Sequence, residues 1–478
     1  MMKEENNEII VIGAGPAGLA AAVRLAELNK KTKVFESSEK VGGMSGSMKI
    51  WGHIVDFGPH RFFSSDKVVV NFWHRYVKDN FVMVKRQTRI YFRNKFFNYP
   101  LKPFNALKNL GVSNSFISLI SYFKSKILPL EEDGSMEIWL SNRFGYKLFK
   151  TFFKTYTEKL WGKSCLELDA DWAAQRIQKL TLGGALKNAL KLNFNKKNNH
   201  KTLVDEFAYP KIGNQYFYDE LKNFVENFNK QKIMFNSQVS KILIDKNKVI
   251  GIELSNGNKY NCKWLISSMP INSLISGMKD VPQEVISAIK KLRFRNTLLV
   301  YLLVEGKDIF PDQWLYIHDP TVLHGRITNF RNWSPDIVNK NGTTVICMEF
   351  WCFEDDDIWR MREEDLINLA SKEVAKIGLI QKEKILEGKL VKVPKCYPMY
   401  ERGYKENLNI VIEFLSKIDG LIPIGRYGSF KYNNQDHSIL MGIMAAESVA
   451  INKSPNLWEI NTDSKYQEAG DSSDISKN

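Results

Sequence analysis

A glycine-rich turn near the start of the chain constrains the fold more than any other feature. Residues 8–12 (EIIVI) predict a buried strand, and residues 19–28 predict a helix. Between them, Gly13, Gly15 and Gly18 take the three glycine positions of the G-x-G-x-x-G pattern. In a dinucleotide-binding turn the first glycine permits the bend, the second admits a pyrophosphate, and the third lets the helix approach the strand. The sequence therefore predicts a βα unit that holds a dinucleotide at a helix N-terminus.

An acidic residue follows at the distance that such a unit requires. Residues 33–36 predict a second strand, and Glu36 ends it 21 residues after Gly15. An acid at this place hydrogen-bonds the adenosine ribose. Gly42 and Gly43 then form a second glycine-rich loop. Its backbone amides can meet the far phosphate of a longer cofactor.

The spacing of Glu36, Gly42 and Gly43 resembles the FAD-binding fingerprint of a superfamily of flavoproteins. That superfamily contains amine oxidases, protoporphyrinogen oxidases and UDP-galactopyranose mutases. The resemblance implies FAD as the cofactor, with Ser45 and Val239 among its contacts.

Residues 55–63 (VDFGPHRFF) resemble a mutase segment that passes beside the flavin. The resemblance places His60 near the reactive flavin nitrogen. A single histidine is more often structural, but here it stands between Gly58-Pro59 and an aromatic run.

Residues 152–162 (FFKTYTEKLWG) resemble a mutase segment whose Tyr and Trp line the nucleotide-sugar pocket. The resemblance therefore implies that Tyr156 and Trp161 bind substrate; without it they would be interpreted as core aromatics. Arg176 lies one residue away from the family position of a pyrophosphate-binding arginine. Arg326, in residues 325–330 (GRITNF), loosely resembles another pocket residue of the family.

Residues 423–436 (PIGRYGSFKYNNQD) resemble the mutase loop Gly-Arg-x-x-x-x-(Lys/Arg)-Tyr-x-Asp-x-Asp. The resemblance implies that Arg426 meets the flavin edge, Tyr432 meets a substrate phosphate, and Asp436 approaches the isoalloxazine. Asn434 replaces the first acid of the family pattern. A fixed cation beside a flavin can stabilise its negative charge when it is reduced. The matching residues are Gly425, Arg426, Lys431, Tyr432 and Asp436.

Composition places the chain among ordinary globular proteins. It has 478 residues, 44% hydrophobic and 25% charged, and its five cysteines form no C-x-x-C pair. We expect a cytoplasmic protein without disulfides, and no metal site, because no ligand cluster is evident. No apolar run is long enough to span a bilayer. Nucleic-acid-binding patterns are not evident, so we expect no nucleic-acid partner.

Positive charge is concentrated in part of the chain. The net charge is +15, and no acid occurs between Asp79 and Glu131. Such a field attracts anions: a nucleotide diphosphate, a phospholipid or an anionic membrane surface. Peripheral membrane contact through the basic, aromatic residues 86–102 is one interpretation, and a buried β-hairpin explains that segment equally well.

The order of predicted elements indicates an α/β fold: a discontinuous Rossmann-type FAD-binding domain, an inserted helical domain and an antiparallel β-sheet substrate domain. We expect the FAD-binding domain in residues 1–75, 202–280 and 395–455, a mainly helical insertion in 76–201, a β-rich substrate domain in 281–394, and a polar tail in 456–478.

The resemblance implies a flavoenzyme that interconverts the pyranose and furanose forms of a nucleotide diphosphate sugar with reduced FAD and no net redox change. It also implies a role in cell-surface polysaccharide biosynthesis. The FAD motifs fit equally an oxidoreductase of the amine oxidase or protoporphyrinogen oxidase type. A flavoprotein scaffold on a membrane surface is a third interpretation.

Overall fold

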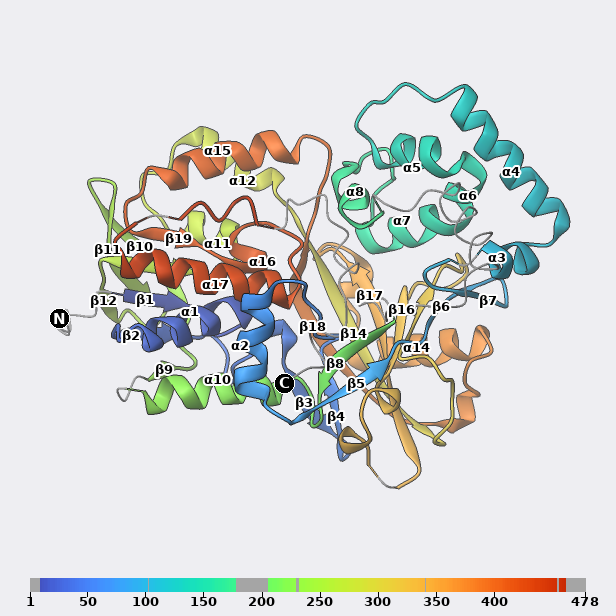
Figure 1. Cartoon of the computed structure of the whole chain (residues 1–478), viewed down its shortest axis with the longest axis horizontal. Helices are drawn as coiled ribbons and strands as arrows, with labels where there is room; N and C mark the ends of the chain where they lie inside the picture. Colours follow the sequence, from blue (N-terminus) through green and yellow to red (C-terminus); the bar gives the residue numbers. More distant parts are fainter. Residues whose placement is uncertain are drawn as a thin grey trace.

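The glycine-turn unit opens a five-stranded parallel sheet (Figure 1). The structure is a computed structural model that describes residues 9–101, 103–177, 205–228, 232–339, 341–453 and 455–460. Distant parts of the chain supply the strands, so this unit is discontinuous. In spatial order the strands are β19 (Leu421–Pro423), β13 (Trp264–Ser267), β1 (Ile9–Ile12), β2 (Thr32–Phe35) and β9 (Ile233–Met234).

Alternate side chains of β1 pack into two different cores, one on each face of the sheet. Ile9 and Val11 pack with one group of helices, and Ile10 and Ile12 pack with the other group and a small antiparallel sheet. The first group is α1 (Pro16–Glu27), α2 (Lys67–Val77), α10 (Gln215–Asn227) and α17 (Gln435–Ala450). The second group is α11 (Ile271–Ser276), α12 (Gln283–Lys291), α15 (Tyr404–Ser416), β10 (Val239–Asp245), β11 (Lys248–Leu254) and β12 (Lys259–Asn261).

The helix after the glycine turn is held close to the last helix of the unit. Pro16 occupies the first turn of α1, where its missing N–H has no intrahelical partner. A Cβ on Gly442 of α17 would lie 2.2 Å from the carbonyl oxygen of Ala17, so only glycine allows this approach. The last helix therefore braces the phosphate-facing end of the first.

A seven-stranded mixed sheet forms the second body of the molecule. Phe294–Glu305 (β14) is buried along all but its last residue, as the apolar sequence predicts. Strand β6 joins this sheet parallel to β15. In spatial order the strands are β18 (Ile385–Pro398), β14, β17 (Thr343–Cys352), β16 (Arg326–Asn329), β15 (Trp314–Ile317), β6 (Thr88–Phe92) and β7 (Lys95–Asn98).

The expectation of a mainly helical segment from residue 76 onward is wrong at its beginning. Residues 81–98 form β5 (Phe81–Lys85) and the hairpin β6–β7. Tyr91 and Phe97 of this hairpin are buried, so the segment 86–102 is used in packing and matches the hairpin interpretation. Two further strand pairs are β5 with β8 (Glu206–Pro210), and β3 (Ser47–Ile50) with β4 (His53–Asp56).

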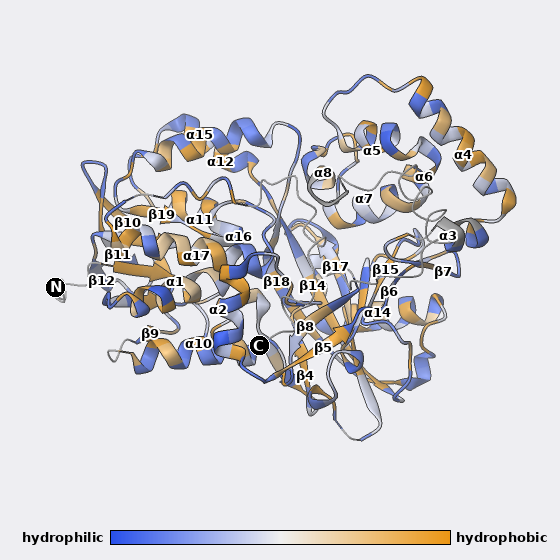
Figure 2. Cartoon of the chain, viewed as in Figure 1, coloured by the Kyte–Doolittle hydropathy of each residue, from blue (hydrophilic) through white to orange (hydrophobic). Residues whose placement is uncertain are grey.

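Helices from the middle of the chain lie together at one end of the molecule, packed against the seven-stranded sheet (Figure 1). They are α3 (Pro103–Leu110), α4 (Val112–Ile127), α5 (Met136–Phe144), α6 (Tyr146–Phe149), a π-helical turn (Lys150–Lys154), α7 (Thr155–Trp161) and α8 (Asp171–Ile177). Hydropathy colouring shows apolar residues along the central strands and, separately, along the outlying α4 (Figure 2). The remaining helices are α13 (Asp357–Arg360), α14 (Glu363–Lys376) and α16 (Gly425–Gly428).

The expected α/β fold class is confirmed, since the chain combines a Rossmann-type parallel sheet with a second, mainly antiparallel sheet and a helical part. The expected polar tail differs at its start: Leu457 is buried in the first core, and residues 461–478 lie outside the described residues. Within the described ranges, no helix combines the length and apolar character needed to cross a bilayer.

Candidate functional site

A cavity of about 1050 Å³ runs from the glycine turn to the face of the seven-stranded sheet. Both sheets and the loop after β19 contribute to its wall. The lining therefore collects residues that are far apart in sequence. Predicted site residues in this lining are Gly13, Gly15, Glu36, Gly43, Ser45, His60, Val239, Arg326, Gly425, Arg426 and Tyr432.

The three glycines of the turn have different surroundings. A Cβ on Gly13, whose φ is +91°, would lie 2.2 Å from Ser268 Oγ. A Cβ on Gly18 would lie 1.8 Å from the Gly13 carbonyl oxygen. A Cβ on Gly15 would meet only the Gly43 Cα, at 3.9 Å, and would otherwise point into open cavity. Gly13 and Gly18 thus shape the turn, whereas Gly15 keeps space beside the helix N-terminus.

Glu36 closes one end of the cavity. Its carboxylate accepts hydrogen bonds from the Ala14 amide at 2.6 Å and from the Ser38 amide at 2.8 Å. These bonds fix the acid against the glycine turn at the carboxyl end of β2, the place of a ribose-binding acid. Gly42 lies behind the wall, where its amide donates to the Ala14 carbonyl at 2.8 Å.

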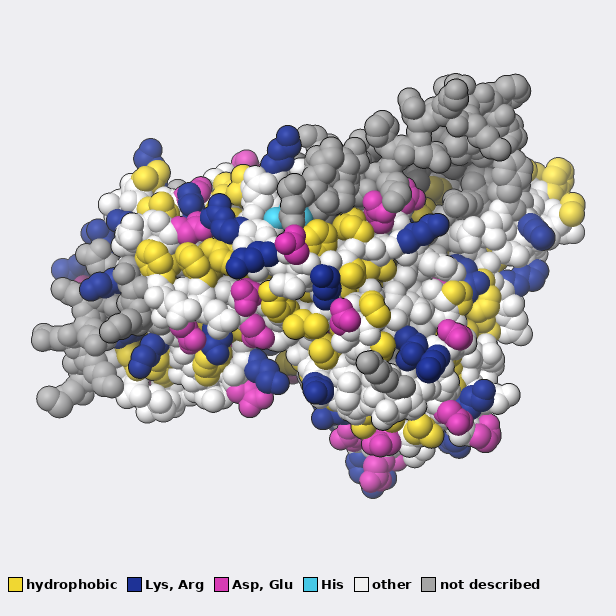
Figure 3. All heavy atoms as spheres, turned by 60° about the horizontal axis from the view of Figure 1, so that its bottom comes forward, with side chains coloured by type: hydrophobic (Ala, Val, Ile, Leu, Met, Phe, Trp, Pro, Cys, Tyr) yellow, Lys and Arg dark blue, Asp and Glu magenta, His cyan; other side chains and the backbone are white. Residues whose placement is uncertain are grey.

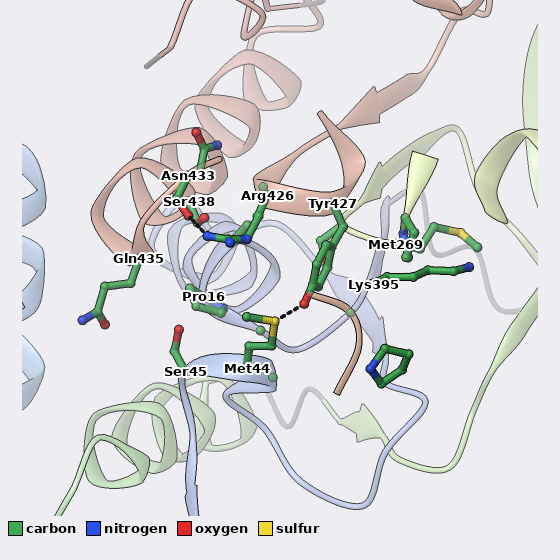
Figure 4. A pocket seen from close by; sticks show the side chains of 18 of the residues that line it. Pro16, Met44, Ser45, Met269, Lys395, Arg426, Tyr427, Asn433, Gln435 and Ser438 are labelled. Atoms are coloured by element: carbon green, nitrogen blue, oxygen red, sulfur yellow. Dashed lines mark hydrogen bonds between the residues drawn. The ribbon is translucent and has the colours of Figure 1, made fainter. Parts of the chain in front are cut away.

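Arg426 lies near the start of α1 and is held in place by several contacts (Figure 4). Its Nε donates to the Cys396 carbonyl and its Nη1 to the Asn433 carbonyl, each at 2.9 Å. The guanidinium lies 4.8 Å from the ring centroid of Tyr397 and 4.2 Å from that of Tyr432. Its Nη2 is buried and has no hydrogen-bond partner among the described residues. A buried donor of this kind is costly unless a ligand accepts from it.

His60 lies near two guanidinium groups and stays neutral. Burial lowers its pKa to about 3, and the positive charges of Arg326 and Arg426 add to that shift. Its Nδ1 is buried without a hydrogen-bond partner in the described structure. The imidazole can therefore offer one donor and one acceptor to a ligand at neutral pH.

Arg326 lines the cavity and forms an ion pair with Glu349, which lies behind the cavity wall. Its Nε and Nη2 each lie 2.5 Å from an oxygen of Glu349, whose side chain is 2% exposed. Its Nη2 also donates to the Tyr397 hydroxyl at 3.3 Å. This bidentate pair fixes the guanidinium plane against the cavity wall.

Tyr156 and Trp161 lie in a layer behind the cavity wall. Tyr156 stacks on His318 with 4.9 Å between ring centroids and meets the edge of Tyr316, which does line the cavity. Trp161 is 1% exposed and contacts Tyr432 edge-on at 6.2 Å. Both residues therefore support lining residues in this structure.

Other predicted residues also lie away from the lining. Lys431 donates to the carbonyls of Trp458 and Ile460. Asp436, in the first turn of α17, has an oxygen 3.1 Å from His437 Nδ1. Arg176 belongs to α8, but its side chain lies outside the described residues.

Several cavity residues were missed by the sequence analysis. Arg61 follows His60 directly and places its guanidinium 4.3 Å from the Phe63 ring and 5.6 Å from the Trp314 ring. Its position next to His60 in the sequence could have indicated that Arg61 also lines the cavity. Aromatic lining residues come from elements whose packing the sequence does not reveal. Tyr427 of α16, for example, donates to the Met44 sulfur across the cavity (Figure 4). The other missed residues include Tyr99, Tyr316 and Lys395.

No group of three or more His, Cys, Asp or Glu suited to a metal ion occurs among the described residues. The polar groups that face the cavity instead match an extended dinucleotide. Space beside Gly15, the acid Glu36 and the unpartnered Arg426 donor fit a cofactor that extends from Glu36 past the glycine turn to Arg426.

Comparison with known proteins places the chain in a family. Residues 16–394 match the model of the flavin-containing amine oxidoreductases, so the chain belongs to that family. FAD is its cofactor. In fold the chain is similar to a crystal structure of reduced UDP-galactopyranose mutase, with a TM-score of 0.81 and 22% identity, covering 95% of this chain and 99% of that one.

Two curated relatives are similar over part of the chain. One is named "Probable UDP-galactopyranose mutase" of Klebsiella pneumoniae, 25% identical over 178 residues. The other is dTDP-fucopyranose mutase of Escherichia coli, 25% identical over 181 residues. Each match covers 34% of this chain and 44% of the relative, so the chain spans less than half the length of the mutases that it matches.

Proposed function

We propose that this chain interconverts the pyranose and furanose forms of a nucleotide diphosphate sugar, with reduced FAD and no net redox change. The charge of the cavity lining carries the proposal. Arg61, Lys395 and Arg426 line it together with Arg326, whose charge Glu349 balances from behind. Glu36 is the only carboxylate among its described lining residues. Because Glu36 lies at the glycine-turn end, the other end is cationic. That field favours a diphosphate and disfavours an amine, which is itself a cation at neutral pH.

The aromatic residues at the cationic end suit the rest of such a substrate. Trp314, Tyr316 and Tyr432 line the cavity near the arginines. Flat rings can stack on a nucleobase, while guanidinium groups pair with phosphate oxygens in a fixed geometry. A porphyrinogen or polyene would instead require a mainly apolar wall. The low-identity mutase relatives support the same reading of the site.

When bound, reduced FAD supplies the nucleophile for the anomeric carbon of the sugar. The chain's own residues have simpler tasks: Arg426 supplies a fixed positive charge at the flavin end, and Arg61 and Tyr432 orient the diphosphate. His60 stays neutral and donates or accepts a hydrogen bond without taking a proton. Tyr156 and Trp161 hold Tyr316 and Tyr432 in place. Orientation of the reacting carbon provides most of the catalysis.

An anaerobic assay tests the proposal. Dithionite-reduced enzyme is incubated with UDP-galactose, UDP-glucose and dTDP-hexoses, and the products are separated by chromatography. Ring interconversion by reduced enzyme but not by oxidised enzyme supports the mutase. Bleaching of the oxidised flavin by an amine or a porphyrinogen, without sugar turnover, would identify an oxidoreductase instead.

A charge variant sharpens the result. Arg61→Met removes a cavity cation, and Arg362→Met removes an exposed one that pairs with Asp365 on the surface. We expect Arg61→Met to raise KM for the nucleotide sugar about tenfold or more, and Arg362→Met to leave it unchanged.

We further infer a cytoplasmic role in supplying sugars for cell-surface polysaccharide.

A further inference from the structure

Helix α4 turns its apolar side chains outward. It packs on α5 and α6 at the edge of the molecule, away from both sheets (Figure 1). Its buried residues are Ser115 and Ser118, whereas six large apolar residues are exposed: Val112, Phe116, Ile117, Ile120, Phe123 and Ile127. This is the reverse of the usual arrangement, in which the apolar stripe of a helix faces the core.

Glycine and serine residues explain how the inner face of α4 packs against α5 and α6. A Cβ on Gly145 would lie 2.7 Å from the backbone nitrogen of Tyr122, so α4 approaches the start of α6 at backbone contact. The Ser121 hydroxyl accepts from the Lys147 amide at 3.1 Å, and the Ser125 hydroxyl lies 3.4 Å from the Asn142 carbonyl oxygen of α5. The helix is thus held by close backbone approach and hydroxyl groups, with only Leu119 and Tyr122 half-buried among its large apolar residues.

The outer face carries a continuous apolar stripe. Its members follow one another at intervals of three or four residues, which is the spacing of one face of an α-helix. The exposed fraction is 64% for Phe116, 59% for Phe123 and 76% for Ile127. The α4 stripe consists of Val112, Phe116, Ile120, Phe123 and Ile127.

Lysines border the α4 stripe on both sides. At about 100° per residue, Lys124 falls on one flank and Lys126 on the other, where its ammonium also donates to the Asn142 carbonyl at 2.9 Å. Both are exposed, and residues 80–130 contain no acid. The acids that follow the helix are Glu131, Glu132 and Asp133, and Asp133 pairs with Arg402. Figure 3 shows hydrophobic and basic side chains together at the right-hand edge, where α4 lies in Figure 1.

We propose that the α4 stripe inserts into the headgroup region of a bilayer rich in anionic lipid. Apolar side chains bounded by lysines are the pattern of a helix that lies in a membrane interface. A second copy of the chain fits less well, because α4 carries no acidic residue that could pair with the lysines of another copy. The binding would hold the enzyme at a membrane surface through α4.

The test is co-sedimentation of the FAD-loaded full chain with vesicles. We compare phosphatidylcholine vesicles with vesicles that also contain phosphatidylglycerol, at low and high salt. The wild type should bind the anionic vesicles, more weakly at high salt. Phe116→Ser/Ile120→Ser/Phe123→Ser should lower the partition coefficient about tenfold or more.

A matched control removes three apolar residues of similar exposure elsewhere. Ile250→Ser/Leu323→Ser/Leu386→Ser changes residues that are 44%, 58% and 52% exposed and should bind like the wild type. Flavin absorbance of each variant shows that it is folded. Failure of the wild type to bind anionic vesicles overturns the proposal, and so does equal binding by the α4 variant. A wild-type dimer in light scattering that the α4 variant converts to monomer, without vesicle binding, would assign the stripe to a second copy.

Discussion

Replacing Gly15 by Ala should separate cofactor binding from folding. Gly15 is the N-cap of α1 with φ −77° and ψ −173°, an extended conformation that any residue adopts. The new Cβ would meet no protein atom closer than the Gly43 Cα at 3.9 Å. Alanine at position 15 is therefore compatible with the fold of the protein without its cofactor. Its methyl group would, however, occupy space that a pyrophosphate needs.

The expected magnitudes follow from these contacts. Alanine is a poorer N-cap than glycine by roughly 0.5 kcal/mol, but it lowers the entropy of the unfolded chain by a contribution of about the same size. The free energy of unfolding without cofactor should thus change by less than about 0.5 kcal/mol. FAD affinity should fall about tenfold or more, which is about 1.4 kcal/mol. Gly15→Val, whose side chain is larger, should yield colourless protein.

Gly18→Ala is the matched control. Its Cβ would lie 1.8 Å from the backbone oxygen of Gly13, so the helix must move, at a cost of about 3 kcal/mol. Urea unfolding of the cofactor-depleted proteins and titration with FAD measure the two effects separately. Normal FAD affinity in Gly15→Ala would refute the assignment of this space to the pyrophosphate. A large loss of stability in that variant would refute the description of Gly15 as unconstrained by packing.

Three further predictions concern buried polar groups. Arg426→Ala should stay folded but bind FAD more weakly and lose activity; wild-type flavin spectra and turnover would remove Arg426 from the site. Glu349→Gln should lower the free energy of unfolding by about 3 kcal/mol, because Arg326 loses its buried ionic partner, and an unchanged urea midpoint would contradict that. Burial raises the pKa of Asp56 to about 7, above the unfolded value of about 3.9. The resulting stabilisation is present at low pH and is lost as pH rises through 7, so the stability of wild type relative to Asp56→Asn should fall by up to about 4 kcal/mol between pH 4 and pH 8. If the difference in unfolding free energy between the two proteins stays constant across that range, the pKa of Asp56 is not raised.

The sequence predicted the parts of the fold that local chemistry determines. The strand, glycine turn, helix and acid at residues 9–36 follow from backbone geometry and spacing. Residues 264–267, 343–352 and 421–423 are apolar runs, the pattern typical of buried strands, and they form β13, β17 and β19. Residues 81–98 were included in the mainly helical insertion, although a hairpin was one interpretation of residues 86–102, because their aromatic and basic residues show neither a clear helical nor a clear strand period. Their pairing with β15 is a long-range contact that no local pattern encodes.

For the candidate site, the sequence predicted which residues take part better than it predicted what those residues contact. The motifs gave Gly15, Glu36, His60 and Arg426, all of which line one cavity. Tyr156 was expected to face substrate. In a helix, however, the sequence around a single aromatic residue does not show whether the ring lines a cavity or packs behind the lining residues. The pairing of Arg326 with Glu349 depends on the register of two strands, which sequence alone did not fix.

The most direct measurement of the proposed reaction follows one bond. UDP-galactose carrying a heavy oxygen isotope at the glycosidic position is incubated anaerobically with reduced enzyme, and recovered substrate is analysed by phosphorus NMR. Breakage and re-formation of the bond to the anomeric carbon should move the label into the non-bridging positions of the β-phosphate, with reduced enzyme only. Label that stays in place, while the flavin gains or loses electrons in proportion to the consumption of another substrate, would contradict the assignment of this chain as a nucleotide-sugar mutase.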